Sequence, residues 1–247
     1  MVPFASLRER IEAYATFGGP PYLAAVDTAA SLEENVTRLS LSPRGEVRHL
    51  VETTLDQEEV LRDVAKYHAV LRAVATGRTR RNEMAQHTGL PNDASLRDKR
   101  ARLVDLGYLG TPTIVDAKPN AAIAYTVADP AMRFHQHFVE PHLALLERED
   151  PHDVWTAHVA SRFSAFVGHE FERVATQAYD RLRRVRRYPL VERWNRWEDT
   201  DRDRAALERN APLLYVAAAG FEDGFSELAS RRGQPLITLT VHDLFEP

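Results

Sequence analysis

Three histidines in the segment FHQHFVEPH, at His135, His137 and His142, are the residues best suited to metal chemistry. Imidazole nitrogens are common ligands of zinc and other transition metals. Residues two apart on a helix point to different faces, however, so His135 and His137 would not converge on one ion. The HExxH arrangement of metalloproteases is absent from the sequence. We therefore expect surface or half-buried histidines, with no metal site and no cofactor.

The acidic run EDTDRDR, with Asp199, Asp201 and Asp203, is the second group that could do chemistry. Metal-dependent cleavage of a phosphodiester needs at least two carboxylates held on rigid neighbouring strands. This run has no apolar residue to anchor a strand, and the intervening arginines would pair with the aspartates. No lysine follows Lys118 in the chain. The sequence therefore predicts no catalytic residues, and a metal-dependent nuclease is the disfavoured alternative.

Basic residues are concentrated between Arg78 and Arg102, where seven arginines and lysines face three acidic residues, a local net charge of +4 in a chain of net charge −4. Such a contrast is typical of a surface that neutralises DNA phosphates. A solvated helix face is the alternative. Lys99 and Arg100 lie where an inward residue is expected, so one of them should lie along the surface with its stem buried. The candidate DNA-binding residues are Arg80, Arg81, Asn92, Ser95, Arg97, Lys99 and Lys118.

A second basic run, RLRRVRR at residues 181–187, allows two interpretations. Its arginines could hold nucleic acid, or they could complement the negative end of a helix dipole, because they fall in the last turns of a predicted helix. The sequence does not decide between the two.

The spacing of apolar residues predicts the helices and strands that position the first basic region, Arg78 to Arg102. Apolar residues at helical intervals predict a helix that ends at Gly77, a short helix capped by Thr79, and a third helix capped by Asn92 or Asp93 and closed by Gly107. Two short alternating runs, TPTIV and AIAYTV, then predict a hairpin. Three helices and a hairpin indicate a winged helix-turn-helix, which commonly lays its third helix in a DNA groove.

Before this module the sequence predicts helices over residues 1–16, 22–30 and 31–39, the last with a Ser31–Glu34 capping box, followed by a linker over 45–57. After it, Asp129-Pro130 begins another helix, and a domain boundary is expected near residue 150. A long helix over 153–187, strands near 190–197, 213–219 and 236–241, and a helix within 220–233 then indicate a small α/β layer.

Composition narrows the class of protein. The 247 residues contain no cysteine, which excludes disulfides and thiolate metal sites and favours a cytoplasmic protein. No run is long and apolar enough for a membrane span, so we expect no membrane partner.

The segments YATFGGPPYLAAVD, SLEENVTRLSLSP, LVDLGYLG, AYTVADPAMRFHQHFVEP and FVGHEFERVA occur in this order. Together they resemble the C-terminal half of archaeal-type AAA superfamily (DEXX-box) ATPases, over essentially the whole chain. The resemblance implies a mostly α protein: a helical lid segment (1–50), a winged helix-turn-helix (51–130), connecting helices (131–150) and a small truncated, degenerate restriction-endonuclease-like α/β domain of unknown function (151–247).

Two features depart from this family. The chain has no GxxxxGK[ST] phosphate loop and no Glu-x-Lys nuclease motif, so we expect no enzyme activity. The leading expectation is a non-catalytic C-terminal portion of such an ATPase that binds DNA through its winged helix. The alternative is a protein-interaction subunit or regulator that docks on an ATPase domain of another chain.

Overall fold

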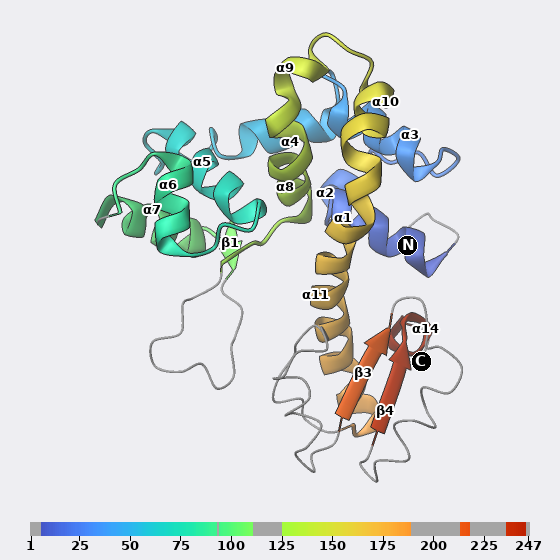
Figure 1. Cartoon of the computed structure of the whole chain (residues 1–247). Coiled ribbons are helices and arrows are strands. Elements are labelled where there is room, and N and C mark those ends of the chain that lie inside the picture. The colour runs from blue at the N-terminus through green and yellow to red at the C-terminus, as the bar shows by residue number, and fades with distance from the viewer. Residues whose placement is uncertain (1–5, 93, 111–124, 189–212, 218–235, 246–247) are drawn as a thin grey trace. The chain divides into compact units, whose positions relative to one another are not determined.

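The computed structural model describes residues 6–92, 94–110, 125–188, 213–217 and 236–245. The described residues are mostly helical, with two small two-stranded sheets, as the sequence predicted at the level of fold class (Figure 1). The chain forms two compact units, residues 1–167 and 168–247. No helix in the described part of the chain combines the length and apolar content that a bilayer crossing requires.

The first unit begins with helices α1 to α4 and continues through two further groups of elements. The helices of the first group are α1 (Leu7–Phe17), α2 (Pro20–Leu23), α3 (Leu32–Val36), the π-helical segment η1 (Thr37–Leu41) and α4 (Glu46–Thr54). The second group is α5 (Val64–Ala75), α6 (Arg81–Thr88), α7 (Ala94–Asp105), β1 (Leu109–Gly110) and β2 (Thr126–Val127). The third is α8 (Pro130–Phe134), η2 (His135–Val139), η3 (Glu140–His142), α9 (Leu143–Leu146), α10 (Pro151–Val154), η4 (Trp155–Val159) and the start of α11 (Ala160–Arg186).

The capping box at Ser31 and Glu34 is confirmed. The Glu34 amide donates to the Ser31 hydroxyl (3.1 Å), and the Ser31 amide donates to the Glu34 carboxylate (2.7 Å). The expected helix over 22–30 is wrong, because α2 ends at Leu23. The buried side chain of Asn35 instead binds both the amide and the carbonyl of Asp27, each at 2.8 Å, which holds this stretch as a turn.

The expected linker over residues 45–57 is also wrong, because most of it forms α4. The inward face of α4 carries Arg48, which is only 6% exposed. Its guanidinium pairs with Glu52 and with Glu147, both at 2.8 Å. A charged residue on the buried face hides the apolar periodicity by which a helix is recognised from sequence.

Acid is expected to weaken the first unit through Glu52. The hydrogen bond from His135 to Glu52, together with Arg48, lowers the pKa of Glu52 to about 2, although partial burial opposes this shift. A carboxyl whose pKa is depressed by folding stabilises the fold above its unfolded pKa and loses that contribution as pH falls. Urea unfolding should therefore show Glu52→Gln less stable than the parent at pH 6, with the difference shrinking between about pH 4.5 and pH 2. A difference that stays constant over that interval would contradict this assignment.

The helix that begins at Asp129-Pro130 is confirmed and forms the centre of the first unit. The Asp129 carboxylate accepts the Met132 amide at 2.8 Å, and Pro130 occupies the first turn. Residues of α8 and η2 are buried on nearly all sides. Phe138 lies 5.1 Å from Phe166 between ring centroids, so this central helix packs against α11.

The long helix expected over residues 153–187 is present as the continuous run of α10, η4 and α11 from Pro151 to Arg186. Its packing differs from the expected assignment to the C-terminal domain. Trp155, Val159 and Phe166 lie in the hydrophobic core of the first unit, and the compact units divide between residues 167 and 168. The turn at residues 149–150 resembles a domain linker in sequence, yet it only reverses the chain within one core.

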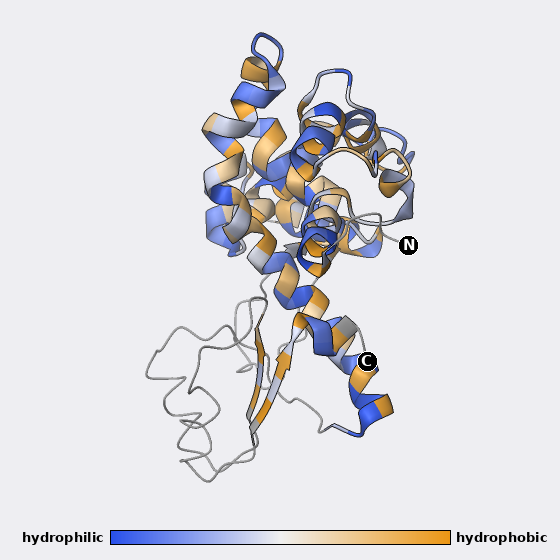
Figure 2. Cartoon of the chain, turned by 90° about the vertical axis from the view of Figure 1, so that its right-hand side faces the viewer, coloured by the Kyte–Doolittle hydropathy of each residue, from blue (hydrophilic) through white to orange (hydrophobic). Residues whose placement is uncertain are grey.

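The second unit contains the end of α11, the strands β3 (Leu213–Ala217) and β4 (Leu236–Thr240), and the short helix α14 (Val241–Phe245). The two strands are parallel, with Tyr215 opposite Thr238, and both are largely hydrophobic (Figures 1 and 2). Their presence confirms the strands predicted near 213–219 and 236–241 within the described residues. The predicted strand at 190–197, the helix within 220–233 and the acidic residues Asp199, Asp201 and Asp203 lie outside the described residues.

Candidate nucleic-acid interface

The candidate interface is built on α5, α6 and α7, which pack together with the β1–β2 pair (Figure 1). Their shared core contains Tyr67, Val70, Leu71, Val74, Met84, Leu96, Leu103, Leu109 and Val127. Two of the helices end as the sequence predicted, at Gly77 (φ 86°) and Gly107 (φ 80°). In each case the following amide bonds back to the helix, from Arg78 to Ala73 and from Tyr108 to Leu103, both at 2.8 Å. These Schellman termini fix the angles between the three helices.

The beginning of the second helix differs from the prediction. Thr79 was expected to cap it, but α6 begins at Arg81 and its N-cap residue is Arg80. The Glu83 carboxylate, at the third helical position, accepts the Arg80 amide at 3.3 Å, which is the contact that the N3 residue of a capping box makes with the N-cap amide. The third helix begins at Ala94, and Asp93 lies outside the described residues.

The base of the predicted hairpin is present. Leu109 pairs with Val127 and Gly110 with Thr126 in an antiparallel register. The first strand of this pair precedes the predicted run TPTIV (111–115), and the second includes the end of AIAYTV (122–127). Residues 111–124, with the whole first run and the candidate residue Lys118, lie outside the described residues.

Three exposed arginines surround the start of α6: Arg78, Arg80 and Arg81. The Arg81 guanidinium donates to the Asn92 carbonyl (3.0 Å), and the Asn92 side-chain amide donates to Asn82. These contacts tie the start of α6 to the turn before α7. The candidate residues Arg81 and Asn92 are thus brought together, and Arg80 is adjacent to Arg81 in sequence. We call the three exposed arginines Arg78, Arg80 and Arg81 the α6 arginine surface.

The exposed face of α7 is less basic than the sequence suggested. Its exposed residues are Ala94, Arg97, Asp98, Ala101, Arg102 and Asp105. Two arginines and two aspartates leave that face without net charge. The candidate Arg97 also pairs with its neighbour Asp98 at 3.3 Å, although both side chains are about two-thirds exposed, at 67% and 69%.

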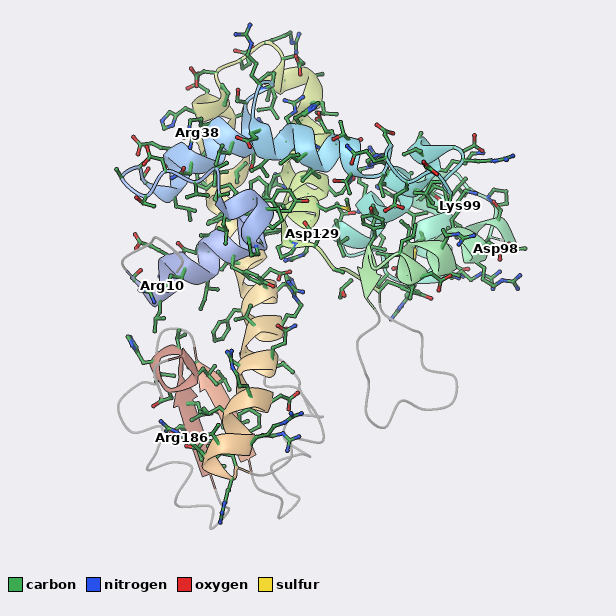
Figure 3. The ribbon with its side chains drawn as sticks, turned by 180° about the vertical axis from the view of Figure 1, so that it is seen from behind. Arg10, Arg38, Asp98, Lys99, Asp129 and Arg186 are labelled. Carbon is green, nitrogen blue, oxygen red and sulfur yellow. The ribbon has the colours of Figure 1, made fainter. Side chains whose placement is uncertain are left out.

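The remaining basic residues of α7 cover aromatic rings. The Lys99 ammonium lies 5.5 Å from the centroid of Tyr67, and the Arg100 guanidinium lies 5.2 Å from that of Tyr125. Lys99 also donates to the candidate Ser95 at 3.4 Å. The sequence predicted that one of these two side chains would lie along the surface. Both do so, because Tyr67 packs under Lys99 and Tyr125 packs under Arg100. Asp98 and Lys99 are labelled in Figure 3.

The positive charge of this interface comes from its arginines, because the nearby His87 is neutral at pH 7. Burial, followed by the neighbouring Arg78 and Arg72, lowers the pKa of His87 at the end of α6. His87 is therefore neutral at pH 7 and adds no charge. Sequence reasoning omitted Arg78 from the candidates, although its place directly after a C-terminal glycine could have indicated an exposed residue.

The histidines considered for metal binding lie in different surroundings. His135 is buried beside Glu52, the His137 ring contacts the Ala75 carbonyl (3.1 Å), and the His142 ring contacts the Phe138 carbonyl (2.8 Å). Among the described residues, no group of three or more histidine, aspartate or glutamate side chains could hold a metal ion.

Comparison with protein-family models, with curated proteins and with solved structures found no match for this chain.

Proposed function

We propose that this chain binds the phosphate backbone of double-stranded DNA, and that α5 to β2 is a winged helix-turn-helix. The order of three helices and an antiparallel strand pair supports the fold, as do the glycine-terminated helices. The observation that carries the function is the α6 arginine surface. Three exposed guanidiniums within four residues lie on a packed scaffold, in a chain whose net charge is −4.

The geometry changes which residues we expect to contact DNA most strongly. The α6 arginines are exposed at a helix start, where the Glu83 carboxylate accepts the Arg80 amide. Arg97 shares its charge with Asp98, and Lys99 is held against Tyr67. We therefore assign the phosphate contacts chiefly to Arg80 and Arg81, assisted by Arg78. Asn92 and Ser95, at the turn before α7 and its first helical turn, are the candidates for contacts to base edges.

A titration of fluorescent duplex DNA with the full chain at two salt concentrations tests this proposal. Binding through phosphates releases counterions, so log Kobs should fall linearly with log salt, by about 0.9 for each contact. Absence of binding at low salt would overturn the proposal, and so would binding that salt does not weaken.

Removing the carboxylate of Asp98 should strengthen DNA binding. The change Asp98→Asn keeps the size of the side chain but releases Arg97 and removes one negative charge from the exposed face of α7. We expect affinity to rise about threefold to tenfold and the salt slope to steepen by up to about 1. Asp105→Asn, at the far end of the same face, is the matched control and should have the smaller effect. Unchanged affinity and salt slope in Asp98→Asn would place α7 away from DNA.

We further propose that the chain is related to the C-terminal half of archaeal-type AAA ATPases, with a degenerate nuclease-like second unit. The parallel β3–β4 pair beside α11 supports such an α/β unit.

The missing phosphate loop favours a second candidate function, docking on an ATPase carried by another chain. Co-purification from the native cell followed by mass spectrometry tests it. A stoichiometric partner with a GxxxxGK[ST] loop is expected, and recovery of the chain alone would count against docking.

No cleavage of single- or double-stranded DNA is expected with magnesium or manganese. The sequence offers no Glu-x-Lys motif and no lysine after Lys118 to steady an attacking water. Incubation of purified protein with labelled DNA and each metal is the measurement. Cleavage that disappears in Asp201→Ala/Asp203→Ala would contradict this prediction, whereas cleavage that persists in that variant would indicate a contaminating nuclease.

A further inference from the structure

The second unit carries a basic surface that the proposed winged helix does not use. Within Asp180–Arg187 there are five arginines and one aspartate, a local net charge of +4. Arg183 pairs with that aspartate at 3.2 Å. The other four arginines are exposed and form what we call the α11 arginine surface: Arg181, Arg184, Arg186 and Arg187. Arg186 is labelled in Figure 3, where it lies at the end of α11.

The helix that carries these arginines is fixed by packing on the side away from Arg181 and Arg184, whereas Arg186 follows the buried Leu182 by four residues and lies beside the packed face. Tyr179 is fully buried and Leu182 is 4% exposed, and both lie in the core of the second unit with Leu239 and Leu244. The Tyr179 and Tyr188 rings stack with centroids 6.2 Å apart. The Tyr188 amide donates to the Arg183 carbonyl (3.1 Å). The arginines therefore extend from a packed helix end rather than from a fraying one.

The negative end of the helix dipole does not account for four exposed arginines at the end of α11. A helix C-terminus carries the equivalent of about half a negative charge, and its influence fades within one turn. Four exposed guanidiniums exceed that charge severalfold. The amide and hydroxyl of Thr240, each at 2.8 Å, lower the pKa of the Asp243 carboxyl, and Arg186 contributes less to this shift. Val185, 76% exposed, lies among the arginines, so no described side chain covers this face.

We infer that the α11 arginine surface is a second contact for the phosphate backbone of double-stranded DNA. Residues 181–187 extend about 9 Å along a helix, at a rise of about 1.5 Å per residue. Duplex DNA presents a phosphate charge about every 1.7 Å of its axis when both strands are counted, so roughly five phosphates, distributed around the duplex, lie within the same length. The arginines are therefore numerous enough to contact the phosphates on the side that faces them. Contact of this kind carries no sequence preference. It does not depend on DNA binding by the first unit.

The test uses the full chain with Arg181→Gln, Arg184→Gln and Arg186→Gln combined. Glutamine has a helix propensity close to that of arginine, and all three side chains are exposed. Loss of three phosphate contacts should lower the salt slope by about 2 to 3 and weaken binding at low salt at least about tenfold. The matched control is Arg8→Gln/Arg44→Gln/Arg148→Gln, which removes the same charge from exposed positions outside both surfaces. Equal effects of the two triple variants would overturn the inference.

Comparing this variant with Arg80→Gln/Arg81→Gln, each measured separately, distinguishes the two proposals. If only the α6 change weakens binding, the proposed function stands and this inference fails. If only the α11 change does so, the inference stands and the winged-helix proposal fails. The corresponding triple lysine variant keeps the charge and should retain most of the affinity. If it instead loses affinity as completely as the glutamine variant while its thermal unfolding is unchanged, charge contact with phosphates is excluded.

Discussion

Replacing Arg80 and Arg81 together by glutamine is expected to weaken binding of duplex DNA about a hundredfold at low salt. A charge-assisted hydrogen bond to a phosphate is strong enough for about a tenfold effect from each arginine. The structure places both residues at the exposed start of α6, where the Arg81 guanidinium also donates to the Asn92 carbonyl in the turn before α7. The slope of log Kobs against log salt should fall by about 2, because two phosphate contacts are lost.

Two control variants test whether the expected loss of affinity is specific to Arg80 and Arg81. Arg8→Gln/Arg44→Gln removes the same charge from exposed positions outside the module and should change affinity much less. Arg80→Lys/Arg81→Lys retains the charge and should keep the salt slope while losing part of the affinity, because lysine lacks the guanidinium fork. An unchanged salt slope in the glutamine variant would show that these arginines do not contact phosphates.

Phe138→Ala should cost the first unit about 3 to 5 kcal/mol of unfolding free energy. Phe138 is completely buried on the central helix, with Phe134 and Phe166 at ring-centroid distances of 5.2 and 5.1 Å. The Arg162 guanidinium lies 5.4 Å from its ring centroid. Truncation leaves a cavity that this close-packed cluster can fill only in part. Native-state hydrogen exchange of the α8 and η2 amides measures the loss within this unit.

Phe138→Leu is the conservative partner of this variant and should cost less than about 1.5 kcal/mol, because it keeps most of the volume. Val60→Ala, at a position of the first unit that is 57% exposed, should change stability by less than about 0.5 kcal/mol. If Phe138→Ala behaves like Val60→Ala, the aromatic cluster is not the centre of the first unit.

The sequence alone was enough for features that depend on neighbouring residues. Helix ends at Gly77 and Gly107, the Ser31–Glu34 capping box and the helix start at Asp129-Pro130 are all present as predicted. Each of these depends on contacts within a few residues, which sequence spacing reveals. The two described strands of the second unit were predicted for a similar reason, because short apolar runs bounded by turn residues indicate buried strands.

Only tertiary structure decided the features that join distant residues. Arg48 sits on the inward face of α4 because Glu147, 99 residues away, supplies a charge partner, and no local pattern could indicate that pair. The first part of the long helix, from Pro151 onward, joins the first unit because Phe166 meets Phe138 there. Lys99 and Arg100 of α7 lie over the rings of Tyr67 and Tyr125, so the exposed positive charge of this module that no neighbouring aspartate balances belongs to the α6 arginines. Sequence counts the charges of a segment, but the packing of its helices decides which of them face solvent.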